Sequence, residues 1–285
     1  MISKETIQTA KKVQKMYGSN YYTATLLLPK DVRYAVFIFY AFVRTADEIV
    51  DNPESSESAA LQLQAFTENW RRVYTGESEN GGEIFTAFRE ICQTYDIDFS
   101  LTEDFLKAMQ QDLTVQRYET YDDLKEYMYG SAEVIGIILT KLFRCTEPSA
   151  LQHARALGEA MQLTNFIRDI HDDYHTRDRI YLPKKDMVDY SVTENDLIEV
   201  PSSEAVRKLI AFEVRRAHSL FSFANAGIHY LPKNVQPAVR TASALYENIL
   251  KEITKNDYAV SIEKISFSTL TKLKIALLYG YGKRN

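Results

Sequence analysis

Apolar residues along this chain recur mostly at helical spacing, and no stretch shows the alternation typical of a strand. The pattern predicts helices over residues 3–17, 34–51, 59–74, 83–95, 101–113, 122–143, 162–173, 204–231, 233–255 and 265–279. Breaks rich in Gly, Ser and Asn separate several of them, most clearly at residues 75–82. We therefore predict a single all-α domain over residues 1–285, a helical bundle around a central apolar cavity.

An acidic stripe runs along the predicted helix that begins at Gln162. At about 100° per residue, four polar side chains share an arc of roughly 80°: Gln162, Asn165, Asp169 and Asp173. Asp172 points about 100° away from Asp173. Carboxylates on one half-buried face repel each other unless a cation lies between them, and oxygen ligands of this kind suit Mg²⁺. A solvated acidic face is the alternative explanation of a single DxxxD pattern.

A second helix repeats the arrangement between Tyr34 and Asp51. Four of its residues fall within roughly 60° of one another: Tyr40, Arg44, Asp47 and Asp51. The rest of this helix is so apolar that we expect it to be largely buried. Two buried acidic stripes that face one another would form an oxygen-lined site for several divalent ions.

These motifs resemble the squalene/phytoene synthase family of head-to-head prenyl transferases. The matching residues are Tyr40-Ala41-Phe42-Val43-Arg44 with Asp47-Glu48-Ile49-Val50-Asp51, and Gln162-Leu163-Thr164-Asn165-Phe166-Ile167-Arg168-Asp169 with Asp173. Arg179-Ile180-Tyr181-Leu182-Pro183 is most similar to the phytoene synthase branch. The resemblance extends from the region of Thr23 to Tyr246, and it implies the fold of class I isoprenoid synthases.

The resemblance also implies the site. Mg²⁺ is the expected cofactor, held by Asp47, Asp51, Asn165, Asp169 and Asp173. The four aspartates are the expected catalytic residues, joined by Tyr129 near the reacting carbons. The residues expected to bind substrate are Tyr17, Gly18, Ser19, Asn20, Tyr21, Tyr40, Arg44, Gln162, Arg168 and Tyr246. Gly18 and Asn20 stand where serines are common, and a plain turn between helices is the alternative for residues 17–21.

The implied reaction ionises one prenyl diphosphate and joins it to a second, identical one through a cyclopropylcarbinyl diphosphate. Two geranylgeranyl diphosphates would give phytoene, with proton loss as the last step. The alternatives are condensation of farnesyl diphosphate to squalene or dehydrosqualene, hydrolysis of a prenyl diphosphate, and a helical scaffold protein without chemistry. A scaffold has no reason to keep both acidic pairs together with Arg44, Asn165 and Arg168.

Three further segments bear on the architecture. Small residues between Tyr127 and Gly136 predict either close helix packing or a channel for long hydrocarbon tails. The stretch from Tyr174 to Ser203 reads as a long loop, and we interpret it as a lid that carries Arg177, Arg179, Lys184 and Lys185. Asp31 is the expected N-cap of the first acidic helix.

Charge and composition limit the partners and the location. A net charge of −5 argues against nucleic acid as a partner. The family resemblance implies prenyl diphosphates as the substrates. No run approaches the length of a membrane span, which predicts a cytoplasmic protein with at most peripheral membrane contact for product release. The amphipathic stretch 265–279 favours a packing helix over a membrane anchor. The oligomeric state stays open, and Cys92 and Cys145 are expected to be core thiols.

Overall fold

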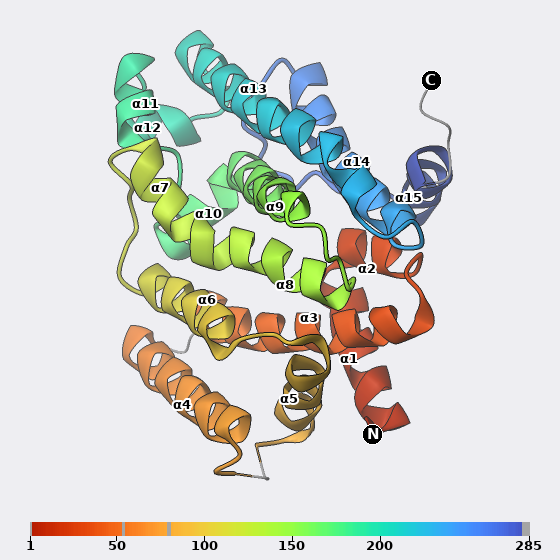
Figure 1. Ribbon diagram of the computed structural model, residues 1–285. Coiled ribbons are helices and arrows are strands. Elements are labelled where there is room, and N and C mark those ends of the chain that lie inside the picture. Colours follow the sequence, from red (N-terminus) through yellow and green to blue (C-terminus); the bar gives the residue numbers. More distant parts are fainter. Residues whose placement is uncertain (1, 53–54, 79–80, 281–285) are drawn as a thin grey trace.

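The computed structural model describes residues 2–52, 55–78 and 81–280, and helices dominate all of them (Figure 1). The first half of the chain forms α1 (Lys4–Tyr17), α2 (Ser19–Thr25), α3 (Lys30–Asp51), α4 (Ser56–Thr75), α5 (Glu83–Tyr95), α6 (Phe99–Asp112), α7 (Tyr121–Met128), η1 (Tyr129–Glu133) and α8 (Val134–Leu142). The second half forms α9 (Ser149–Arg168), α10 (Ile170–Arg177), α11 (Lys184–Asp189), α12 (Glu194–Ile198), α13 (Glu204–Ala226), η2 (Ile228–Tyr230), α14 (Gln236–Lys255), α15 (Thr269–Ile275) and η3 (Ala276–Gly280). In the described ranges the only β-type pairing is an isolated bridge between Arg117 and Ile180. The prediction of an all-α fold is confirmed.

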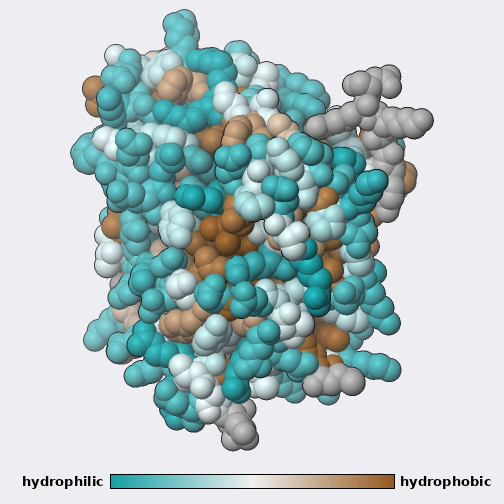
Figure 2. Space-filling model, viewed as in Figure 1, coloured by the Kyte–Doolittle hydropathy of each residue, from teal (hydrophilic) through white to brown (hydrophobic). Residues whose placement is uncertain are grey.

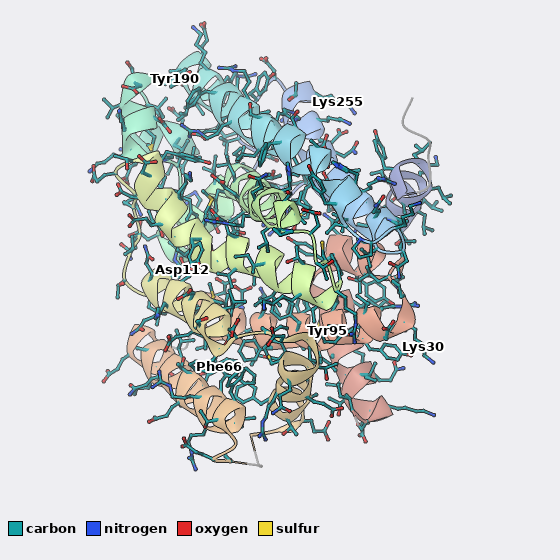
Figure 3. The ribbon with its side chains drawn as sticks, viewed as in Figure 1. Lys30, Phe66, Tyr95, Asp112, Tyr190 and Lys255 are labelled. Atoms are coloured by element: carbon teal, nitrogen blue, oxygen red, sulfur yellow. The ribbon has the colours of Figure 1, made fainter. Side chains whose placement is uncertain are left out.

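Helix α3 lies in the interior of the protein because apolar residues cover most of its surface. It packs against α1, α4, α5 and α6. Phe42 is fully buried, and its ring centroid lies 4.6 Å from that of Phe88 and 4.9 Å from that of Trp70. Phe66 completes this aromatic cluster between α4 and α5 (Figure 3). Each buried ring contributes about 1.5–3 kcal/mol, so this cluster fixes the position of α3 and of the acidic pair at its end.

Most helices begin and end within a few residues of the predicted positions, because capping residues and helix breakers act locally. The helix predicted over residues 3–17 is α1, and the Ser3 hydroxyl caps it by accepting a hydrogen bond from the Thr6 backbone amide. The prediction of Asp31 as N-cap of α3 is wrong, because Pro29 occupies that position. Asp31 lies in the first turn instead, where its negative charge favours the helix dipole.

The small-residue segment is split by a π-helical turn, η1, between α7 and α8. A Cβ atom at Gly130 would lie 2.5 Å from the Asp104 carbonyl oxygen, and one at Gly136 would lie 2.4 Å from that of Ala154. The two glycines therefore allow α6 and α9 to pack closely against this segment. Of the two predictions made for the small residues, close helix packing explains both glycines. Side chains of the same segment still line a cavity, as described below.

The interpretation of residues 174–203 as a long loop is wrong. Helix α10 extends to Arg177, and α11 and α12 occupy much of the rest. A capping box stabilises α12, in which Thr193 and Asp196 exchange side-chain and backbone hydrogen bonds. The backbone amides of Lys184 and Lys185 donate to the carbonyls of Tyr118 and Glu119, so this segment is fastened to the residues that precede α7.

The C-terminal helices α15 and η3 pack on α14. Ile275 forms a small buried cluster with Ala244 and Leu245. In the described part of the chain, none of the helices combines the length and the apolar character needed to cross a bilayer.

Candidate active site

The first acidic pair lies at the C-terminal end of α3. Asp47 and Asp51 occupy its last two turns, one turn apart on one face. The Arg44 guanidinium lies 2.6 Å from an Asp47 oxygen and 3.7 Å from an Asp51 oxygen, and it also bonds Glu48. The Tyr17 ring covers this guanidinium at 4.7 Å. Arg44, Asp47 and Asp51 thus lie together on α3, as the helical pattern predicts, and Tyr17 lies beside them.

The second pair spans a break between two helices. The sequence predicts one continuous helix, but Asp169 leaves helical geometry (φ −101°, ψ 11°) and separates α9 from α10. The amide of Asp173 still donates to the Asp169 carbonyl at 2.8 Å, so both residues keep nearly the expected relative position. Their exposure follows the predicted faces, since the Asp173 side chain is 16% exposed and that of Asp172 is 50% exposed.

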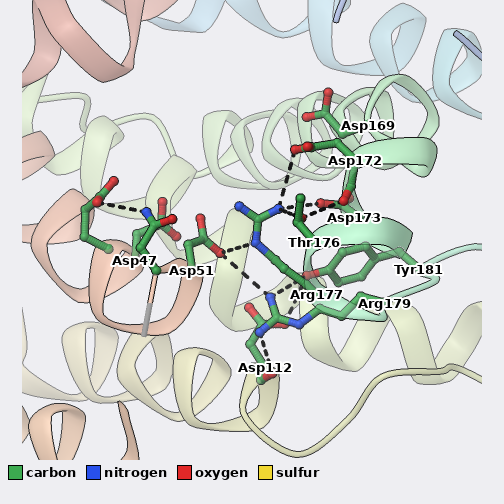
Figure 4. Close-up of polar contacts among 12 residues, drawn as sticks. Asp47, Asp51, Asp112, Asp169, Asp172, Asp173, Thr176, Arg177, Arg179 and Tyr181 are labelled. Atoms are coloured by element: carbon green, nitrogen blue, oxygen red, sulfur yellow. Dashed lines mark hydrogen bonds and ion pairs between the residues drawn. The ribbon is translucent and has the colours of Figure 1, made fainter. Parts of the chain in front are cut away.

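Arg177 joins the two pairs across the bundle. Its Nε lies 3.3 Å from an Asp51 oxygen, and its Nη1 lies 3.2 Å from an Asp173 oxygen (Figure 4). Lys264 approaches Asp169 in a similar way, at 3.1 Å. The two acidic pairs therefore face one another, and basic side chains lie between their carboxylates.

Burial and repulsion from acidic neighbours raise the pKa of two of these carboxyl groups, Asp173 and Asp47. Desolvation, followed by the charges of Asp169 and other acidic neighbours, raises the pKa of Asp173 to about 7 despite the nearby Arg177. Burial and the charge of Asp51 likewise raise the pKa of Asp47. Strongly perturbed carboxyl groups in one cluster are typical of a functional site.

The raised pKa of Asp173 predicts how stability depends on pH in the absence of metal. Between about pH 4 and pH 7 the folded protein holds a proton on Asp173 that the unfolded chain releases, so this residue's contribution to stability falls as the pH rises. Asp173→Asn should remove that contribution and raise the melting temperature at pH 8. Melting curves of both proteins from pH 5 to pH 8 in EDTA measure the effect. Parallel pH dependences in the two proteins would contradict it.

The segment expected to bind diphosphate is the start of a short helix, not a turn. Gly18 separates α1 from α2, and a Cβ atom there would lie 2.5 Å from the Tyr40 hydroxyl oxygen, which explains the absence of serine. The ammonium group of Lys272 donates to the Ser19 hydroxyl at 2.6 Å. Asn20 follows half-buried on α2. Lys272 was not predicted, because it lies more than 250 residues away in sequence.

Tyr21 of this segment packs against two further tyrosines, and it lines the same cavity as two polar residues of α9. The Tyr21 ring lies 5.4 Å from that of Tyr246 and 6.4 Å from that of Tyr40. Gln162 accepts a long hydrogen bond from Asn165 at 3.5 Å. Arg168 donates to Asp169 at 2.7 Å, so it is the second predicted arginine that the fold brings to the carboxylates.

Asp112 is a member of the site that the sequence pattern does not indicate, because it lies among polar residues at the end of a helix. It is buried at the end of α6, between that helix and α7 (Figure 3). Its carboxylate accepts hydrogen bonds from Tyr127 at 2.6 Å and Tyr181 at 3.2 Å. Arg179 donates to its carbonyl and lies 3.8 Å from Asp51, so this network supports the first acidic pair from below (Figure 4).

Tyr129, which the resemblance places near the reacting carbons, lies beside the cavity-lining segment and is directed to α9. Its ring lies against the partly exposed Arg155 guanidinium at 5.5 Å, and it is not among the described residues that line the cavity. Tyr127, two residues earlier, lines the cavity instead. The π-helical turn that begins at Tyr129 shifts the faces of this segment, which sequence periodicity cannot reveal.

An apolar cavity of about 320 Å³ extends inward from the carboxylates. Its polar end includes Tyr40, Asp47, Gln162 and Asn165. Along α9 its lining continues from Asn165 back to Ala150, which at 1.5 Å per residue corresponds to about 22 Å. Ser131, Ala132, Ile135 and Leu139 line it from η1 and α8. On the outside of the molecule, apolar side chains also gather over α8 (Figure 2).

The donor set fits a hard divalent cation. Two pairs of carboxylates face one another across Arg177, and the buried Oδ1 of Asn165 has no hydrogen-bond partner. Among the described residues, no three acidic, histidine or cysteine side chains are close enough to bind a metal ion as they stand. Arg177 and Lys264 lie against the same oxygen atoms that such an ion would need. Residues 47, 51, 165, 169 and 173 therefore remain the ligands expected for Mg²⁺.

Comparisons with known proteins agree with this geometry. A 15-cis-phytoene synthase of Synechococcus elongatus is 29% identical over 281 residues, covering 94% of this chain and 90% of the relative. The phytoene synthase of Arthrospira platensis is 29% identical over 282 residues, with the same coverage of 94% and 90%.

Solved structures give the same result. A dehydrosqualene synthase in complex with ligand superposes with a TM-score of 0.88 at 25% identity, over 95% of this chain and 94% of the other. Squalene synthase HpnC from Alicyclobacillus acidocaldarius shares the fold, with a TM-score of 0.81 at 24% identity over 90% and 96%. The model of the family described as squalene/phytoene synthase matches residues 14–275. Because this match covers most of the sequence, the chain belongs to the squalene/phytoene synthase family.

Proposed function

We propose that this enzyme joins two geranylgeranyl diphosphates head to head and forms phytoene through a cyclopropylcarbinyl diphosphate. The observation that carries the proposal is the pair of facing carboxylate clusters, with their arginines, at the polar end of a long apolar cavity. The similarity to phytoene synthases over 94% of the chain supports the twenty-carbon substrate.

The polar end binds the diphosphates. Arg44 and Arg168 already lie at the carboxylates and can donate charge-assisted hydrogen bonds to phosphate oxygens. Lys264 and Lys272 add two ammonium groups from the C-terminal segment. When bound by Asp47, Asp51, Asn165, Asp169 and Asp173, Mg²⁺ neutralises the charge of the diphosphate.

The cavity wall protects the carbocation. Breaking the bond between C1 and the diphosphate oxygen of the first substrate gives an allylic cation, which water would capture in an open site. The double bond of the second substrate attacks this C1, and loss of one proton closes the cyclopropane ring. The second diphosphate then leaves, the ring opens to the 1′–1 bond, and loss of a second proton gives phytoene. Tyr127, held by Asp112, is the tyrosine that we place beside these carbons in the role expected of Tyr129.

The segment from α10 to α12 serves as the cover of this end. Arg177 and Arg179 extend from it to Asp51, whereas Lys184 pairs with Glu119 on the surface and Lys185 is exposed. Only the two arginines can therefore take part in closing the site over bound diphosphate.

Product identification tests the proposal. The protein is incubated with Mg²⁺ and either geranylgeranyl or farnesyl diphosphate, and we expect phytoene from the former. A fifteen-carbon preference with dehydrosqualene as product would favour the alternative raised by the dehydrosqualene synthase fold. A prenyl alcohol alone would indicate a phosphatase. A scaffold protein would show no turnover, and Mg²⁺ with a diphosphate analogue would not raise its melting temperature. In an enzyme that binds the analogue, a concentration 100-fold above Kd raises the free energy of unfolding by about 2.7 kcal/mol.

Product formation should not require NADPH. The sequence has no glycine-rich nucleotide-binding motif, and proton loss needs no reductant. We expect equal rates and the same hydrocarbon with and without NADPH, measured by chromatography of the extracted products. Accumulation of the cyclopropyl intermediate without NADPH, and of a reduced hydrocarbon with it, would contradict this prediction.

A further inference from the structure

The C-terminal helices expose a stripe of large apolar side chains. Leu270, Leu273, Leu277 and Leu278 are 72%, 50%, 68% and 67% exposed, and Tyr279 is 40% exposed. Leu273, Leu277 and Leu278 follow Leu270 by three, seven and eight residues, which places the four leucines on one face of the α15–η3 segment. Large apolar residues exposed together on one helical face mark an interaction surface.

The opposite face of the same segment explains why these leucines cannot turn inward. Lys272, Ile275, Ala276 and Gly280 are buried against the body of the protein. A Cβ atom at Gly280 would lie 2.9 Å from the Thr241 hydroxyl, and Lys272 is held by Ser19. The orientation of the segment is therefore fixed, and the leucines must face outward.

Charge distinguishes this surface from the rest of the molecule. The chain has a net charge of −5, but residues 264–280 contain no acidic residue and three lysines. Two of these, Lys264 and Lys272, contact Asp169 and Ser19 at the site, so Lys274 is the lysine of this segment on the outward face. Lys274 is exposed among the leucines, and the exposed Lys251 lies 5.7 Å from the Tyr279 ring centroid. Leucines bordered by lysines complement a bilayer surface with anionic headgroups.

The surface also lies close to the apolar cavity. Only one layer of structure separates them, because Leu27 contacts the Gly280 position while its neighbour Leu28 lines the cavity. Helix α14 has the same double role, with Thr241 beneath η3 and Ala238 and Ala242 in the cavity wall. Figure 1 shows α15 at the edge of the molecule beside α14 and α2, away from α4.

We infer that the α15–η3 surface, defined as Leu270, Leu273, Lys274, Leu277, Leu278 and Tyr279, docks on an anionic lipid bilayer. The leucines enter the boundary between headgroups and acyl chains, and Lys251 and Lys274 contact the headgroups. A bilayer bound there lies next to the cavity from which an apolar product must leave. That last point rests on the proposed function, whereas binding to lipid does not.

Vesicle flotation without substrate tests the inference. The whole protein is mixed with vesicles of phosphatidylcholine alone or with 30% phosphatidylglycerol, and the floated fraction gives a partition coefficient. We expect binding to the anionic vesicles that weakens with added salt. No binding to anionic vesicles at low salt would overturn the inference. The proposed reaction could still hold in that case, since product identification is a separate measurement.

Two variants locate the surface. Leu273→Ser, Leu277→Ser and Leu278→Ser combined should lower the partition coefficient at least about tenfold, because three apolar side chains no longer enter the bilayer. The matched control is Leu61→Ser, Leu151→Ser and Val188→Ser combined, which removes side chains that are 62%, 41% and 69% exposed on α4, α9 and α11. This control should stay within about twofold of the unmodified protein. Lys251→Glu with Lys274→Glu should lower binding to anionic vesicles at least about fivefold.

Equal binding by the leucine variant and its control would overturn the assignment of the surface. Sedimentation without lipid covers the alternative of a second copy of this chain. A dimer that only the leucine variant dissociates, combined with no vesicle binding, would identify a protein interface instead. Cooperative melting of each variant near the temperature of the unmodified protein shows that the fold is intact.

Discussion

Asp173→Asn should lower turnover at least about a thousandfold, whereas Asp172→Asn should lower it less than about tenfold. The two residues are adjacent on α10, but Asp173 lies 3.2 Å from the Arg177 guanidinium inside the site and Asp172 is half exposed. An amide keeps the size of the side chain and removes its charge, so the loss reports the charge alone. Steady-state rates with geranylgeranyl diphosphate and saturating Mg²⁺ measure both effects.

Asp47→Asn, Asp51→Asn and Asp169→Asn should behave like Asp173→Asn, because all four carboxylates belong to the same cluster. None of them should unfold the protein, since each substitution relieves repulsion among half-buried carboxylates in the metal-free state. Melting temperatures in EDTA provide the control. Equal damage from Asp172→Asn and Asp173→Asn would show that the assignment of the inward face of α10 is wrong.

The helices and the main carboxylates could be predicted from sequence because both depend on local periodicity. Asp47 and Asp51 lie four residues apart on a strongly apolar helix, so burial and orientation follow from the pattern alone. The pattern did not show the helix break at Asp169. Asp169 still keeps its predicted position relative to Asp173, because the Asp173 backbone amide donates a hydrogen bond to the Asp169 carbonyl.

Features that depend on tertiary packing could not be read from the pattern. Asp112 lies at a helix end with polar neighbours, and only its distant partners Tyr181 and Arg179 reveal that it is buried. Lys264 and Lys272 come from the C-terminal segment and contact Asp169 and Ser19, which are distant from them in sequence. Short helices such as α11 and α12 carry too few residues for a periodic signal.

Small residues gave the most ambiguous signal. A glycine inside an apolar helix indicates that another group packs closely against the helix backbone. It does not show whether this group is a bound ligand or the backbone of a neighbouring helix. At Gly136 it is the Ala154 carbonyl, so Gly136→Leu would disturb the contact of α8 with α9 before it narrowed any channel. A test of substrate length must use side chains that project into the cavity.

Ala154→Phe should change the preference for substrate length by at least about a hundredfold. Ala154 lines the cavity eleven residues before Asn165 on α9, about 16 Å from the polar end. A phenyl ring there occupies the space of the last five-carbon unit of a geranylgeranyl tail and leaves the shorter farnesyl tail room. Each methylene that loses its burial costs about 0.8 kcal/mol, so four or five of them correspond to a factor of about 10²–10³.

Val43→Phe is the matched control, because Val43 lines the same cavity only one turn from Asp47. A ring at that position meets the first carbons of either substrate, so it should lower kcat/KM for both by similar factors. The ratio of kcat/KM for geranylgeranyl over farnesyl diphosphate, measured for the three proteins, separates length selection from general damage. An unchanged ratio in Ala154→Phe would mean that the tail does not extend along α9 to this depth. A preference of the unmodified protein for farnesyl diphosphate would show that the cavity accepts fifteen carbons and that phytoene is not the product.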